Sequence, residues 1–192
     1  MMIFLVNGAI AAAVLLALGS CSGPERRADE AAAPEASSAR PVVLARDEGE
    51  RRVLRFPGPP RTFILKVDPK NSGSRQLLAG YQDIAPGDRI SPHRHVGADE
   101  LIFLHKGRAL VEVGDIRREM SEGATIFVPR GTRMAMRPSG TEPITIFYVL
   151  SDPGYAGYMR DVSVKEGEPV VPLSDAERDS IRASHRAHVE YE

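Results

Sequence analysis

Cysteine, aromatic residues and excess charge are all scarce in this sequence of 192 residues. Its one cysteine, Cys21, excludes an intrachain disulfide and any zinc site built from several cysteines. Tryptophan is absent, and 25 lysine and arginine residues nearly balance 26 aspartate and glutamate residues, so the formal net charge is −1. A balanced chain lacks the strongly basic surface of nucleic-acid-binding proteins, and we therefore expect no nucleic-acid partner.

Long apolar runs are also missing outside the first twenty residues. The uninterrupted part of that segment, residues 9–18, is shorter than the stretch of about 20 residues that a membrane-spanning helix needs. Its length is typical of a secretory signal peptide, which we assign to residues 1–20. A short uncleaved anchor is the alternative interpretation.

The signal ends in Leu18-Gly19-Ser20-Cys21, which resembles the lipobox of bacterial lipoproteins, although no lysine or arginine precedes the apolar run. The resemblance implies that Cys21 is lipidated and anchors the chain to a membrane of the cell envelope. Because Ser22 rather than aspartate follows the cysteine, it implies the periplasmic face of the outer membrane if the host is Gram-negative. A plain secretory signal with a coincidental cysteine is the alternative.

Three further regions are expected after the signal. Residues 21–52 are rich in alanine, proline and mixed charges, which predicts a disordered tether. In residues 53–152, short apolar runs alternate with turn residues, which predicts an all-β domain, a jelly roll or small barrel. The expected strands cover residues 62–67, 76–84, 101–105, 109–113, 116–120, 125–128, 133–137 and 144–150, with a tight hairpin at Gly114-Asp115.

Helical periodicity appears only in the third region, a C-terminal extension over residues 153–192. Ser174 and Glu177 form a capping-box pattern at its start. Apolar and histidine residues then recur at helical spacing through His188 and Val189. We therefore expect one amphipathic helix, from Ser174 to about Val189, that packs on the barrel or on a partner subunit.

One short segment concentrates residues that bind metals. His93 and His95 lie two apart in an extended segment, so both side chains point to the same face. Glu100 follows a short turn and can present its carboxylate to the same place. Two imidazoles and one carboxylate form a facial triad that suits a divalent transition metal such as Fe, Mn, Ni, Cu or Zn and leaves positions open for other ligands.

The same segment resembles the first sequence motif of the cupin superfamily, G-x5-H-x-H-x4-E-x6-G. Every defined position matches, at Gly87, His93, His95, Glu100 and Gly107. The resemblance covers roughly residues 60–150 and implies a double-stranded β-helix, the cupin jelly-roll barrel, with a metal in its mouth.

The second cupin motif, G-x5-P-x-G-x2-H-x3-N, is only partly kept. Gly123, Pro129 and Gly131 match, but Met134 replaces the histidine that is the fourth metal ligand in the family, and Pro138 replaces the asparagine. Three ligands still suffice for a facial triad. We therefore interpret Met134 as a wall of the ligand pocket, and Tyr148, on a late strand, as a second substrate-binding residue.

Other candidates have weaker patterns. We expect His105, His185 and His188 to pack or face solvent rather than bind a metal. Arginine residues flank both motifs and could bind an anionic ligand at the mouth, although exposed arginines are usually only solvated. They are Arg89, Arg94, Arg130 and Arg133.

Three functions remain open from the sequence. The first is a lipid-anchored metalloprotein with an unknown small-molecule substrate, whose chemistry, if it is an enzyme, is oxygenase-like or isomerase-like. The second is a non-catalytic small-molecule-binding lipoprotein of the cell envelope that has lost its metal. The third is a structural envelope protein. Resemblance to the cupins also implies a homodimer.

Overall fold

The structure, a computed structural model, describes residues 39–192. The expected signal peptide, residues 1–20, and the lipidation site at Cys21 lie outside these residues, as does most of the expected tether. The elements in chain order are β1 (Glu50–Leu54), β2 (Thr62–Val67), α1 (Pro69–Ser72), β3 (Leu78–Ile84), β4 (Ile90–His95), β5 (Glu100–Lys106), β6 (Arg108–Val113), β7 (Ile116–Ser121), β8 (Thr125–Val128), β9 (Met134–Pro138), β10 (Ile144–Leu150), α2 (Tyr155–Asp161), β11 (Ser163–Lys165), α3 (Asp175–Ser184) and β12 (Val189–Tyr191).

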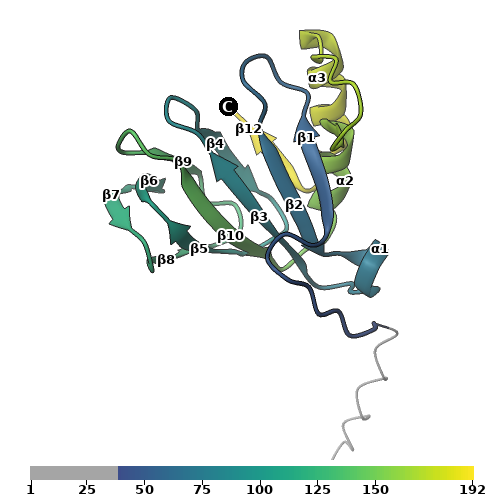
Figure 1. Cartoon of the computed structure of the whole chain (residues 1–192), viewed down its shortest axis with the longest axis horizontal. Coiled ribbons are helices and arrows are strands. Elements are labelled where there is room, and N and C mark those ends of the chain that lie inside the picture. The colour runs from purple at the N-terminus through teal and green to yellow at the C-terminus, as the bar shows by residue number, and fades with distance from the viewer. Residues whose placement is uncertain (1–38) are drawn as a thin grey trace, which may run out of the picture. The chain divides into compact units, whose positions relative to one another are not determined.

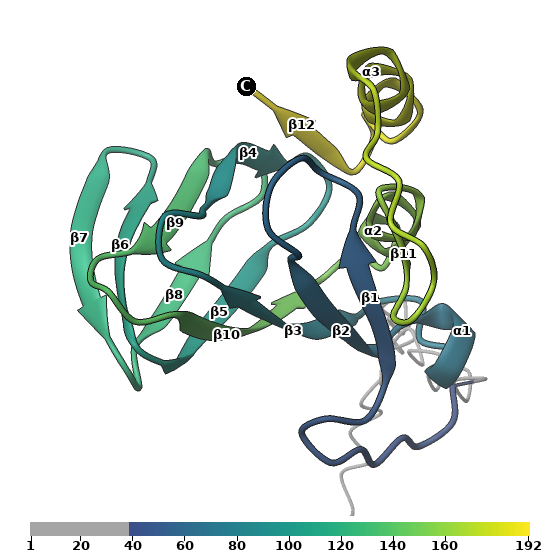
Figure 2. The ribbon, with the colours of Figure 1, turned by 45° about the horizontal axis from the view of Figure 1, so that its top comes forward.

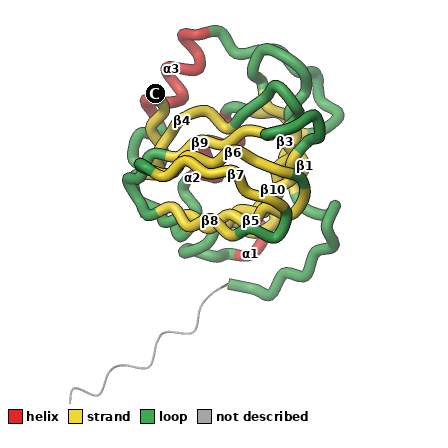
Figure 3. The backbone as a smooth tube through the Cα atoms, turned by 90° about the vertical axis from the view of Figure 1, so that its left-hand side faces the viewer, coloured by secondary structure: helices red, strands yellow, loops and turns green. Residues whose placement is uncertain are grey.

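Two antiparallel sheets form the domain (Figure 1). One has seven strands in the order β11-β1-β2-β3-β10-β5-β8, and the other has five in the order β12-β4-β9-β6-β7. The sheets face one another as two layers, with β4, β9, β6 and β7 above β8 and β5 in Figure 3. Two packed antiparallel sheets with a helix near the C-terminal end are a jelly roll, as the sequence predicts.

Alternating burial along the strands explains the two layers. In β5, residues 100, 102 and 104 are buried, while Leu101 and Phe103 are exposed. The inner faces of both sheets supply one apolar core, in which Phe63, Leu78, Ile102 and Ile144 are at most 1% exposed. Period-two burial is the pattern of a sheet with one face on a core, and it directs every second side chain of β4 inward.

Turns occur where the sequence predicts them. The expected hairpin joins β6 to β7, with Val113 opposite Ile116 and Gly114 in the left-handed region at φ 55°. Such a two-residue turn requires positive φ, which glycine adopts without strain. The first strand starts at Glu50, before the expected domain boundary at residue 53, and pairs with both β2 and β11.

The sequence predicts the start of the C-terminal helix correctly, but the predicted end of this helix is wrong. Ser174 accepts a hydrogen bond from the Glu177 amide, and the Glu177 side chain accepts one from the Ser174 amide, so the capping box is formed. The helix, however, ends at Ser184, and Val189 begins strand β12 instead. β12 pairs with the otherwise open edge of β4, because that edge has backbone groups that need partners. Figure 2 shows the chain returning from α3 toward β4.

A second helix, α2, has no signal in the sequence that we recognised. Its seven residues are too few for a clear period, yet Tyr158 and Met159 are buried. It contacts β11 and α3, and both helices lie beside β1 in Figure 2. Within residues 39–192, none of the helices has the length and hydropathy needed to cross a membrane.

Candidate metal centre

His93, His95 and Glu100 converge inside the barrel. His93 and His95 lie on β4, and Glu100 is the first residue of β5. One potential ligand atom from each lies within 4.8 Å of those of the other two. All three side chains are buried, with residue exposures of 5%, 3% and 6%. The spacing that the sequence motif predicts therefore brings these three residues together.

The tautomer of His93 is fixed by a backbone contact. Its Nδ1 lies 2.8 Å from the carbonyl oxygen of Ser91, which can only accept a hydrogen bond. Nδ1 therefore carries the proton, and Nε2 has a free lone pair. Orientation of a ligating imidazole through its other nitrogen is a common feature of metal sites.

Burial sets the protonation state of the cluster. It lowers the pKa of His93, and together with the neighbouring His93 ring it lowers the pKa of His95 to about 3. Both imidazoles are therefore neutral at pH 7, as a metal ligand must be. Burial also raises the pKa of the Glu100 carboxyl to about 8. A carboxyl in this place lacks a compensating positive charge.

Glu100 also lacks a hydrogen-bond partner. Its Oε2 is buried and unpartnered, and lies 3.7 Å from Nε2 of His95, beyond hydrogen-bond distance. An unsatisfied buried oxygen costs free energy unless something else binds it. The donor set of two imidazole nitrogens and a carboxylate fits a divalent transition metal, and such an ion would satisfy this oxygen.

A cavity of about 30 Å³ adjoins the three side chains. Both residues that the sequence suggested for substrate binding line it: Met134 is 1% exposed and lies opposite His93 on β9, and Tyr148 is 4% exposed on β10. The end of the Tyr148 ring packs on Gly80, where a methyl group would approach the hydroxyl to 2.5 Å. The cavity has room for about one water-sized molecule beside an ion.

The C-terminal extension supplies part of this site, which the sequence did not indicate. Tyr191 of β12 stacks on His93 with ring centroids 5.3 Å apart, and Tyr155 of α2 meets His95 edge-on at 4.6 Å. Tyr155 also lines the cavity. These residues are far from the motif in sequence, and no spacing rule relates them to it.

The side chains of the remaining histidines do not join this group. His105 is on the outer face of β5, against the ring of Tyr81. His185 and His188 each contact an aspartate, with 2.7 Å from Nε2 of His185 to Asp161 and 2.7 Å from Nδ1 of His188 to Asp152. Among residues 39–192, His93, His95 and Glu100 form the one group of metal-binding side chains this close together.

Three of the four arginines near the motifs have carboxylate partners. Arg94 pairs with Glu190, Arg130 with Asp99 at 2.9 Å, and Arg133 with Glu192 at 2.9 Å. For Arg89, the described part of the chain provides no carboxylate partner. The arginines are thus on the surface rather than in the cavity beside the histidines.

Comparison with known proteins agrees with this geometry. Residues 80–150 match the Cupin domain family. The chain is 25% identical over 85 residues to the tetracenomycin polyketide synthase protein TcmJ of Streptomyces glaucescens, an alignment covering 44% of this chain and 57% of TcmJ. It is 22% identical over 106 residues to protein SchB of Streptomyces halstedii, covering 55% of this chain and 77% of SchB.

A solved structure shares the fold. A protein of Thermotoga maritima described as a predicted oxalate decarboxylase superposes with a TM-score of 0.51 at 15% identity, over 57% of this chain and 98% of that one. Identity this low supports the fold and not the activity. The segment that matches the Cupin domain family, residues 80–150, contains both candidate histidines and Glu100.

Proposed function

We propose that this protein binds one divalent transition metal through His93, His95 and Glu100. The observation that carries the proposal is that three buried side chains each bring a ligand atom within 4.8 Å of the others, while Oε2 of Glu100 is buried without a hydrogen-bond partner. Two neutral imidazoles and a carboxylate suit Fe, Mn, Ni, Cu or Zn. The choice among these metals follows from availability as much as from the ligands.

A metal in this place would supply open coordination positions that can polarise a bound ligand or activate a water molecule. The protein's own residues limit what can reach them. His93 is held by Ser91, and Met134 and Tyr148 close two sides of the cavity. Tyr191 stacks on His93, and Tyr155 meets His95 edge-on. A cavity of about 30 Å³ admits a water-sized ligand, so an organic substrate requires these walls to move.

We further propose that the protein is held in the cell envelope by a lipid on Cys21, with the segment before β1 acting as a spacer. The lipobox-like sequence supports this location. If the protein is an enzyme, we propose that it carries out an oxygenase-like or isomerase-like reaction on a small molecule. A role in binding without catalysis is the alternative, and a homodimer remains part of the proposal from resemblance to other cupins.

Metal analysis tests the central proposal. Purified without a histidine tag, the protein is expected to contain close to one transition-metal ion per chain. His93→Ala and Glu100→Gln should lose it, while His105→Ala, which removes a histidine on the outer face of the same sheet, should retain it. Metal-free wild-type protein that also fails to bind added Co²⁺, Mn²⁺ or Zn²⁺ would contradict the proposal.

A further inference from the structure

A second hollow lies on the opposite side of the five-stranded sheet from the histidines. Side chains of β4, β9 and β6 line a cavity of about 260 Å³, much larger than the one beside Glu100. The alternation of the strands explains the separation: in β9, Met134 and Met136 point into the barrel, and the residues between and after them, Ala135 and Arg137, point outward. The hollow therefore faces solvent and has its own chemistry.

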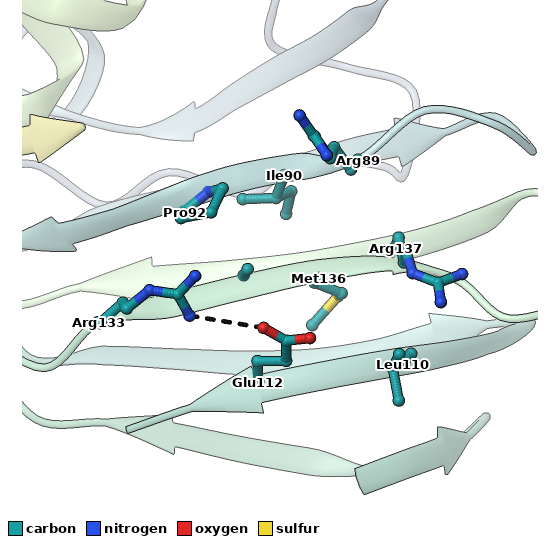
Figure 4. Close-up of a pocket in the computed structure, with 9 residues that line it drawn as sticks. Arg89, Ile90, Pro92, Leu110, Glu112, Arg133, Met136 and Arg137 are labelled. Atoms are coloured by element: carbon teal, nitrogen blue, oxygen red, sulfur yellow. Dashed lines mark hydrogen bonds and ion pairs between the residues drawn. The ribbon is translucent and has the colours of Figure 1, made fainter. Parts of the chain in front are cut away.

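Apolar and charged side chains together line this hollow (Figure 4). Ile90, Pro92 and Leu110 form half-buried walls on neighbouring strands. Arg133 stands at one end, where its charge is neutralised by Glu112 at 3.5 Å and Glu192 at 2.9 Å. Figure 4 shows the Arg133–Glu112 pair on the side of the hollow away from Arg137.

The other end carries two arginines without acidic partners. Ile90 pairs with Met136 across β4 and β9, so the next positions in that register are Arg89 and Arg137. Leu110 lies opposite Arg137 on the far side. Neither Arg89 nor Arg137 forms an ion pair within residues 39–192, unlike Arg94, Arg130 and Arg133. Two like charges across adjacent strands repel each other, which costs free energy. An anion bound between them would remove this repulsion.

We propose that this hollow is a binding site for a small amphiphilic anion, one with a carboxylate or phosphate group and an apolar body about the size of one aromatic ring. Arg89 and Arg137 bind the anionic group, and Ile90, Pro92 and Leu110 contact the apolar body. The volume suits a ligand below drug size, and both arginines line the same hollow as the apolar side chains, a combination that occurs in ligand sites. Ile90 lines both this hollow and the cavity beside the histidines, whereas Arg89 and Arg137 line only the hollow.

Titration of the full chain with benzoate and with phenyl phosphate, followed by NMR or calorimetry, tests the proposal. Both probes should bind with a common set of perturbed residues on β4, β6 and β9. Inorganic phosphate, which lacks the apolar body, and benzyl alcohol, which lacks the charge, should each bind at least tenfold more weakly. If neither aromatic anion binds at 10 mM, the proposal is overturned. A dissociation constant of that size corresponds to a binding free energy of only about 2.7 kcal/mol.

Variants locate the binding. Arg89→Gln and Arg137→Gln should each weaken benzoate binding about tenfold, whereas Arg118→Gln removes a charge from β7 of the same sheet, outside the hollow, and should leave it unchanged. Equal losses in all three would indicate attraction to overall charge and would overturn the proposal. His93→Ala should bind benzoate like wild type. Loss of benzoate binding in that variant would place the anion at the metal site instead. The anion proposal and the metal proposal can therefore fail separately, and the two failures are distinguishable.

Discussion

Tyr191 lies flat against His93, with the ring centroids 5.3 Å apart and the planes 23° from parallel. The contact joins the third residue of the last strand to a candidate metal ligand almost a hundred positions earlier in the chain. It exists because β12 pairs with β4 and places Tyr191 opposite His93 and Val189 opposite His95. A C-terminal residue outside residues 80–150 therefore packs directly against a candidate metal ligand.

Deletion of residues 189–192 should expose the edge of β4. Without β12, the β4 amides that face it lose their partners, and hydrogen exchange in residues 90–96 is expected to quicken. Exchange in β3 should stay slow, because β3 lies between β2 and β10 in the other sheet. Mass spectrometry of peptides from both strands provides the measurement. Unchanged protection of β4 would mean that β12 contributes no stable pairing.

Met134→His is expected to raise metal affinity. Met134 lies opposite His93 on β9 and lines the cavity, and the family motif has a histidine at this position. A fourth nitrogen ligand should strengthen Zn²⁺ or Co²⁺ binding by tenfold or more, which equals ~1.4 kcal/mol. Calorimetric titration measures the change. Met136→His, a buried substitution two residues along the same strand, is the control and should not strengthen binding.

Tyr148→Phe should stabilise the metal-free protein. The Tyr148 hydroxyl is buried without a hydrogen-bond partner, and burial raises its pKa, so it is a polar group held in a poor environment. Replacing it by hydrogen removes a desolvation cost of about 1 kcal/mol. Thermal unfolding of metal-free protein is expected to shift upward by a few degrees. A lower unfolding temperature would show that the hydroxyl makes a stabilising contact.

Glu50 should make stability depend on pH in the acid range. The Arg160 guanidinium hydrogen-bonds to the Glu50 carboxylate, and with Arg52 it lowers the pKa of Glu50 from 4.5 to about 2. A carboxyl group whose pKa is lower in the folded than in the unfolded protein stabilises the fold when the pH is above the unfolded-state pKa. It loses that effect as the pH falls through the folded-state pKa. The contribution is therefore complete above pH 4.5 and disappears toward pH 2, and amounts to at most about 3 kcal/mol.

The Glu50→Gln variant checks this linkage. Urea unfolding between pH 6 and pH 2.5 should show a flatter decline in stability for the variant than for wild type. Glu142→Gln serves as the matched control, because Glu142 is exposed and makes no ion pair within residues 39–192. Identical pH profiles for wild type and Glu50→Gln would contradict the assignment of acid sensitivity to this contact.

Local patterns predicted the barrel and the candidate ligands well. Alternating apolar residues located β2, β8 and β10 at their observed bounds, and Gly114 marked the hairpin between β6 and β7. The spacing of His93, His95 and Glu100 predicted their convergence because two neighbouring strands carry all three. Each of these features is decided within a few residues of chain.

The rest depends on contacts between distant segments. Tyr155 has no local property that places it against His95, and the change from helix to strand before Val189 is decided by the open edge of β4. Helical spacing through His188 was a real pattern, but tertiary pairing overrode it. Arg137 did not stand out in sequence, since its relation to Arg89 follows from the register between β4 and β9.

The pairing of β12 with β4 also affects where an affinity tag can be placed. Glu192 hydrogen-bonds through its amide to the carbonyl of Pro92, one position from His93. Anything joined after Glu192 thus starts within a few residues of the barrel mouth, and a polyhistidine fusion there would offer competing imidazoles to the very ion being assayed. Affinity handles intended for metal work on this protein belong elsewhere in the chain.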